Sequence, residues 1–197
     1  MEKLEVIRQN TSIQPLAMGG SNFETQVLFQ KSPFRYEFKP SRAFGFFCGA
    51  FALVPIIIIA VIIYQNSNTY GYSLIENSWP LLLFTFIWSF GALFLVRSLF
   101  RPIVFDKSTN RFYKGFFRDK TKNAKYNISI SRIVALQIIG EIISGKNKKY
   151  NSYELNLVLE DASRINVIDH GNLKGVIADT ETLSKFLNLP IWTAEDI

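Results

Sequence analysis

The clearest pattern in the chain is a pair of long hydrophobic runs, residues 43–64 and 79–96, and neither run contains a charged side chain. A helix rises about 1.5 Å per residue, so roughly 20 residues cross a hydrocarbon core of ~30 Å. Both runs are long enough. The pattern therefore predicts a membrane-spanning helical hairpin, with spans at 43–64 and 79–100 and an external loop at 65–78.

Basic residues lie on one side of this hairpin only. The segment 65–78 carries no Lys or Arg, whereas both flanks do: Lys31, Arg35, Lys39 and Arg42 precede the first run, and Arg97, Arg101 and Lys107 follow the second. This asymmetry is the positive-inside pattern. It predicts a multi-pass protein of the cell (inner) membrane with both termini in the cytoplasm. Because topology accounts for much of the net charge of +6, the charge does not favour nucleic acid as a partner.

Outside the spans the pattern is typical of strands and turns. Residues 1–20 show weak periodicity and are expected to form a mobile or loosely docked arm, and residues 21–42 a β-hairpin that joins the cytoplasmic sheet. In 101–197 the strongest signal is the alternation of Tyr153, Leu155 and Leu157, followed by a turn and another strand. Residues 133–143 fit a helix by length, but their composition favours a strand. Asn172 can cap a helix that runs to Leu187.

The predicted fold is therefore a membrane α-helical hairpin plus an α+β cytoplasmic domain, in which a C-terminal helix caps an antiparallel sheet. This order of elements resembles bacterial membrane proteins with a pleckstrin-homology-like (PH-like) domain, whose sheet is a partly closed barrel. Finer similarities are to an uncharacterised family of small two-span bacterial membrane proteins, and they lie in residues 20–25, 38–41, 105–115, 166–172 and 186–192. The resemblance implies binding of lipid head groups or peptides and implies no catalytic residues.

Small residues in the spans suggest where helices meet. Gly45 and Gly49 share one helix face at G-x-x-x-G spacing, and Thr85 and Ser89 are four residues apart on the second span. Either the two helices pack through these residues within one chain, or the glycines form an interface between copies.

Two basic loops are the candidate sites for binding lipid or a partner. Their basic residues are Arg118, Lys120, Lys122, Lys125, Lys146, Lys148 and Lys149. Each Lys or Arg near an anionic leaflet contributes about 1 kcal/mol, so several together could dock the domain on a membrane. The alternative is a pair of solvated turns away from lipid.

Catalytic chemistry finds little support in the residue types. His170 is the only histidine and Cys48, inside the first span, the only cysteine, so a Cys–His pair or a metal site rich in these ligands is excluded. No phosphate-binding or dinucleotide-binding glycine motif occurs. The Asp169–His170 pair fits local capping better than an imidazole oriented for catalysis or for sensing pH. We therefore expect no enzyme activity, no metal and no cofactor.

The function that follows is a membrane anchor whose PH-like cytoplasmic domain binds a protein partner or anionic lipid. The alternative is an oligomeric membrane effector or pore gated by its cytoplasmic domain, as in antiphage systems. Neither span has an ionisable group, and two helices alone cannot enclose a pore, so this alternative requires several copies.

Overall fold

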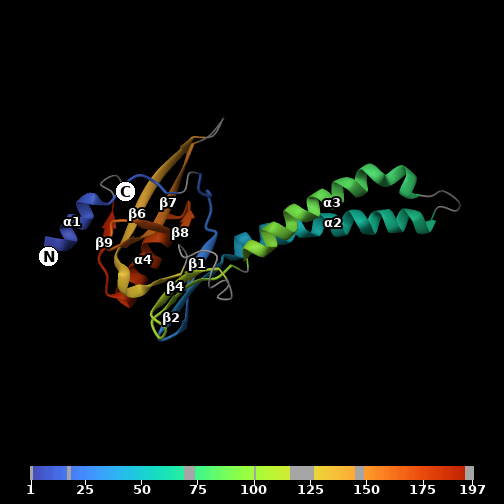
Figure 1. The fold of residues 1–197 in the computed structure, drawn as a ribbon. Coiled ribbons are helices and arrows are strands. Elements are labelled where there is room, and N and C mark those ends of the chain that lie inside the picture. Colours follow the sequence, from blue (N-terminus) through green and yellow to red (C-terminus); the bar gives the residue numbers. More distant parts are fainter. Residues whose placement is uncertain are drawn as a thin grey trace. The chain divides into compact units, whose positions relative to one another are not determined.

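A computed structural model describes residues 2–16, 19–68, 74–99, 101–115, 127–144 and 149–193 (Figure 1). The chain divides into two compact units. One contains Met1–Ser41 together with Pro102–Ile197, and the other contains Arg42–Arg101. The apolar helices are thus an insertion between two parts of a single soluble unit.

The inserted unit is a pair of packed helices, α2 (Arg42–Asn68) and α3 (Leu74–Leu99). Two stretches within them, Arg42–Gln65 and Ser78–Arg97, are long and apolar enough to cross a membrane. Only 11% of each stretch is buried, so neither is the core helix of a soluble domain. The predicted loop 65–78 is too long, because both helices continue beyond the apolar runs into polar sequence that does not break a helix.

A tryptophan of α3 compensates for a proline in the middle of α2. Pro55 has no N–H, so it cannot donate to the carbonyl of Phe51, four residues earlier. The indole Nε1 of Trp88 donates to that carbonyl at 3.0 Å, and its ring stacks on the Phe51 ring with centroids 4.9 Å apart. In apolar surroundings a backbone carbonyl without a donor is costly. Trp88 therefore supplies the missing donor and joins the two helices.

We predict that Trp88→Phe destabilises the helix pair by about 0.5–1.5 kcal/mol, mainly because it leaves the Phe51 carbonyl without a donor. Pro55→Ala restores an N–H for that carbonyl, so Trp88→Phe should cost less in the Pro55→Ala background. The measurement is equilibrium unfolding of the full chain in mixed micelles, arranged as a double-mutant cycle. Equal costs in the two backgrounds would contradict this account, because the lost ring packing is common to both.

The soluble unit contains two sheets. The first is antiparallel, and its strands in order are β1 (Gln26–Ser32), β2 (Arg35–Pro40), β3 (Ile103–Asp106), β4 (Arg111–Lys114) and β5 (Asn127–Ser129). The second is mixed, in the order β8 (Arg164–His170), β7 (Lys149–Leu159), β6 (Ile133–Ser144) and β9 (Ile191–Thr193). A short 3₁₀ turn, η2 (Ile130–Arg132), interrupts the chain between β5 and β6. The prediction of a single sheet is wrong in this respect, whereas the α+β class is confirmed.

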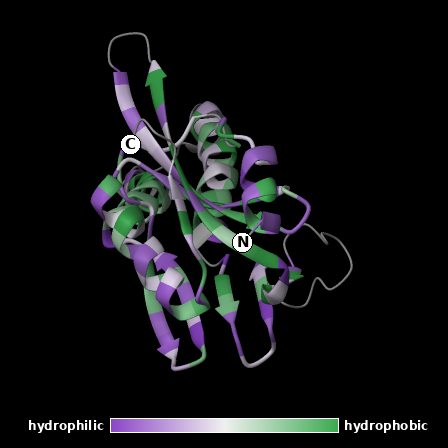
Figure 2. Ribbon diagram, turned by 90° about the vertical axis from the view of Figure 1, so that its left-hand side faces the viewer, coloured by the Kyte–Doolittle hydropathy of each residue, from purple (hydrophilic) through white to green (hydrophobic). Residues whose placement is uncertain are grey.

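Helix α4 (Leu173–Leu187) contributes to one core shared with both sheets. Asn172 caps it, because its side-chain oxygen accepts a hydrogen bond from the N–H of Gly175 at 3.2 Å. Asn188 ends it in the left-handed conformation. Figure 2 shows hydrophobic and hydrophilic stretches along the strands. The apolar side chains of the core come from every layer, among them Phe38, Phe105, Phe112, Leu136, Leu155, Leu157, Val176 and Leu183.

The opposite face of the second sheet is covered by the N-terminal segment. Helix α1 (Glu2–Asn10) buries Ile7 in a cluster with Ala135, Val158 and Trp192. Residues 11–16, called the strap from here on, continue across the same face. Of the two alternatives for residues 1–20, a mobile or a docked arm, the described residues 2–16 show the docked one. The periodicity of this segment is weak because α1 buries a single side chain and the strap is held by its backbone.

Candidate functional site

Polar side chains from three strands hold the strap on the sheet. Their hydrogen bonds are Gln137 Nε2 to the carbonyl of Ser12 at 3.1 Å, Arg164 Nη2 to the carbonyl of Gln14 at 2.7 Å, and the N–H of Leu16 to Glu154 Oε2 at 2.9 Å. Glu154 is only 1% exposed and Asn156 is fully buried beside it. Such buried polar groups are tolerated where they are hydrogen-bonded, so the strap is part of the sheet's stability.

This face of the sheet is acidic. Burial, together with the neighbouring carboxylates of Glu154 and Glu141, raises the pKa of Asp169, whose side chain accepts a hydrogen bond from Ser152 Oγ. Burial also lowers the pKa of the Arg164 guanidinium, which nevertheless bonds Gln137 and the strap. The backbone passes close to the acidic groups at Gly20, where a Cβ would collide with the side chains of Asp169 and Ser152.

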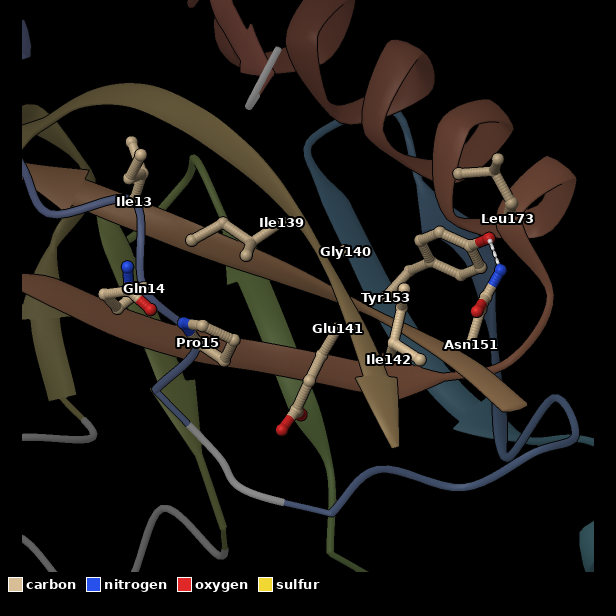
Figure 3. A pocket seen from close by; sticks show the side chains of 10 residues that line it. All are labelled: Ile13, Gln14, Pro15, Ile139, Gly140, Glu141, Ile142, Asn151, Tyr153 and Leu173. Atoms are coloured by element: carbon tan, nitrogen blue, oxygen red, sulfur yellow. Dashed lines mark hydrogen bonds between the residues drawn. The ribbon is translucent and has the colours of Figure 1, made fainter. Parts of the chain in front are cut away.

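A pocket of about 390 Å³ opens beside these carboxylates at the end of β6, and we call it the edge groove (Figure 3). Its lining residues are Ile13, Gln14, Pro15, Ile139, Gly140, Glu141, Ile142, Asn151, Tyr153 and Leu173. Directly paired residues share a face, so Ile142 and Gly140 lie on the face of Asn151 and Tyr153. Ile139 and Glu141 lie on the opposite face, and Figure 3 shows Glu141 pointing away from Tyr153 and Leu173. The edge groove therefore wraps around the border of β6.

Within the described part of the chain, the second half of β6 has no partner strand on this border. Strand β9 pairs in parallel with Leu136, Gln137 and Ile138, and no other described strand pairs with residues 139–144 on this side. The N–H of Leu136 donates to the carbonyl of Pro190 on the β9 side. Because backbone direction alternates along a strand, Gly140, Ile142 and Ser144 turn their N–H and C=O groups to the open edge. All three are exposed, Ile142 to 69%.

Most of the predicted basic site lies outside the described residues. This holds for Arg118, Lys120, Lys122, Lys125, Lys146 and Lys148, whereas Lys149 is exposed at the start of β7. The edge groove was missed by the sequence analysis. The only indication of it in the sequence is Ile142, an apolar residue near the end of the run 133–143. It lies beyond the part of the strand that is covered on both faces.

The predicted helix-packing residues do not meet. Thr85 Oγ1 donates to the carbonyl of Leu81 and Ser89 Oγ to that of Thr85, both at 2.7 Å, so these hydroxyls bond within their own helix. No atom of the described chain outside the helix's own nearby backbone lies within 4 Å of a Cβ placed on Gly45 or Gly49. The glycines therefore do not face α3; the buried residues of the helix pair include Cys48 of α2 and Thr85 and Ala92 of α3.

The side chain of His170 lies in the interior of the fold. It is fully buried, and its Nδ1 accepts a hydrogen bond from the N–H of Asn172 at 3.3 Å. Burial lowers its pKa, which keeps the imidazole neutral near pH 7. Its Nε2 has no hydrogen-bond partner within the described part of the chain. Among the described residues no three His, Cys, Asp or Glu side chains are grouped so that they could hold a metal ion.

No protein-family model matches the chain, and no curated protein matches it either.

Asp179 of α4 ties the helix to the edge strand β1. Its Oδ2 accepts a hydrogen bond from the N–H of Leu28 at 3.2 Å. Burial and, to a smaller extent, the nearby Glu24 together raise the pKa of this carboxyl to about 6, against the lowering effect of the Leu28 bond. The unfolded chain has a value of about 3.9. The folded state therefore binds the proton more tightly, and stability falls as pH rises from about 4 through 6.

We predict that Asp179→Asn stabilises the protein at pH 8 by about 1 kcal/mol, because an amide can still accept the Leu28 bond without a buried charge. The gain should vanish near pH 4, where the carboxyl is neutral. Thermal unfolding of the detergent-solubilised full chain at several pH values measures the difference from wild type. Asp161→Asn is the control: hydrogen bonds from Ser163 lower the pKa of Asp161, so this variant should show no gain at pH 8. A pH-independent effect of Asp179→Asn would contradict the assignment.

Proposed function

We propose that the chain is a membrane anchor that presents a PH-like soluble unit on the cytoplasmic face and binds a protein partner there. The observation that carries the proposal is the edge groove, an open strand border next to a hollow with apolar and acidic walls. Pockets of roughly 300–1,000 Å³ with a few placed polar groups are typical of binding sites. Two helices with largely exposed apolar side chains support the membrane anchor.

The chain connectivity supports a hairpin with both termini on one side. Residues before and after the helices belong to one unit, in which β2 pairs with β3 and Phe38 lies opposite Ile103. The chain thus leaves and re-enters the soluble unit at neighbouring strand ends. If both helices cross a bilayer, the two termini share a side, and the basic flanks favour the cytoplasmic side.

A protein is favoured over anionic lipid as the partner at this site. Glu141, Glu154 and Asp169 make the neighbourhood of the edge groove acidic, and their charges would repel an anionic head group. The groove is therefore better matched to a partner that carries positive charge.

One experiment tests the side and the partner together. A membrane-impermeant, amine-reactive crosslinker is added to right-side-out and to inverted vesicles from cells that contain the full chain. We expect a discrete adduct between the soluble unit, for example through the exposed Lys174 and Lys185, and one protein in inverted vesicles only. An adduct in right-side-out vesicles would overturn the topology. Modification of these lysines without any protein adduct would overturn partner binding.

A specific observation favours a second candidate, the oligomeric membrane effector or pore. Gly45 and Gly49 lie on a surface of α2 that the rest of the described chain leaves open. Small residues at this spacing allow close approach of two transmembrane helices. In this candidate α2 contacts α2 of another copy and leaves the α2–α3 contact intact.

For this candidate we predict that Gly45→Leu with Gly49→Leu converts an oligomer to a monomer, because two leucines keep the helix axes apart. Mass measurement in mild detergent, or single-molecule photobleaching in nanodiscs, determines the stoichiometry. Leu53→Ile, a change of shape at an exposed position of the same helix, is the control. A monomer before and after the substitutions would exclude the oligomeric candidate.

A further inference from the structure

We propose that residues 139–144 of β6 bind an extended segment of the protein partner as an added strand, with a basic side chain of that segment facing Glu141. The inference rests on the proposed function and specifies the partner's chemistry and its mode of binding. Addition of a strand to an open sheet edge is a recurring mode of peptide recognition, in which the backbone provides affinity and the alternate side chains provide specificity.

The backbone of β6 is already arranged for this. Gly140, Ile142 and Ser144 direct their N–H and C=O groups to the open edge, by the alternation that begins with the Leu136–Pro190 hydrogen bond. The same edge accepts β9 in parallel at residues 136–138. A partner strand would therefore continue an edge along which this protein itself pairs a strand at residues 136–138.

The two walls of the edge groove require different side chains from the partner. On one face Ile142, Tyr153 and Leu173 are mainly apolar, and Ile142 is 69% exposed although it lies within a strand. On the other face Glu141 has a buried Oε2 atom without a hydrogen-bond partner in the described chain. Because side chains alternate across a strand, the segment that fits has apolar residues alternating with a Lys or Arg.

Charge argues for a basic segment rather than a second copy of this chain. Glu141 lies close enough to Asp169 to raise the pKa of that carboxyl, so the negative charge extends beyond a single residue. Antiparallel pairing of two copies centred on Ile142 would bring both Glu141 side chains to neighbouring positions on one face. Like charges at such diagonal positions, which long side chains can still reach across, repel each other. A cationic side chain is instead attracted to the Glu141 carboxylate.

The test measures, by fluorescence anisotropy, the binding of a labelled peptide to the full chain in nanodiscs. The peptide has the alternating sequence Lys-Ile-Lys-Val-Lys-Ile-Lys. Two matched peptides serve as controls, one with Glu in place of each Lys and one with Pro in place of the central Val. We expect the basic peptide to bind and to slow hydrogen exchange at the amides of Gly140 and Ile142. The acidic and the proline peptides should bind at least tenfold more weakly, because one lacks the charge and the other lacks a backbone donor.

Two variants of the protein separate the backbone from the charge. Ile142→Pro removes an N–H that points to the open edge and takes no part in the β7 ladder, so the sheet should tolerate it. It should weaken binding about tenfold, as the loss of edge hydrogen bonds requires, while Ile142→Thr, which keeps the N–H, should weaken it much less. Glu141→Gln should reduce affinity about fivefold and lower its salt dependence, whereas Glu160→Gln, at an exposed turn, should do neither.

The outcomes distinguish this inference from the proposed function. Equal binding of the basic, acidic and proline peptides, or binding unchanged by both Ile142→Pro and Glu141→Gln, would overturn strand addition. If the crosslinked partner from inverted vesicles is retained by both variants, the proposed function stands and the inference fails. Loss of that partner from both variants, with unchanged thermal unfolding, would support both. A peptide effect that depends on Glu141 but not on the N–H of residue 142 would identify the groove as a site for small cations and also overturn strand addition.

Discussion

The pairing of β2 with β3 is the constraint on which the rest of the structure depends. Phe38 lies opposite Ile103, so the last strand before the apolar helices and the first strand after them are neighbours in one sheet. The sheet cannot close until both helices have been synthesised. The hairpin of β1 and β2 and the segment after α3 therefore belong to one domain. Because β2 pairs with β3, the start of α2 and the end of α3 must lie close together, and a membrane hairpin satisfies this requirement.

The second sheet has a different requirement, because its outer face contains buried polar side chains. Glu154, Gln137 and Arg164 would be costly there without partners. The backbone of the strap supplies those partners, and α1 covers the small apolar cluster beside it. The N-terminal segment is therefore a layer of the fold. The strap forms one wall of the edge groove through Ile13, Gln14 and Pro15.

The helix pair illustrates the same dependence on distant partners. Pro55 removes a donor from its own helix, and Trp88 of the other helix replaces it. Thr85 and Ser89, by contrast, satisfy their hydroxyls locally, and Gly45 and Gly49 contact nothing in α3. Residue type thus did not indicate which side chains join the helices. The contacts in the folded structure show which side chains join α2 to α3, and these contacts depend on how each helix is rotated about its own axis.

The sequence by itself determined the elements whose signal is local. Uninterrupted hydrophobicity predicted α2 and α3, period-two alternation predicted the β7–β8 hairpin, and the Asn172 cap predicted the start of α4. Tertiary structure alone decided that there are two sheets, that the strap is docked, and that β9 pairs with β6 at residues 136–138 in the described part of the chain. Periodicity reports which face of an element is buried, but it does not report which neighbour covers that face or where an edge stays open. The edge groove consists of residues more than 150 positions apart, from Ile13 to Leu173, so only the folded chain could reveal it.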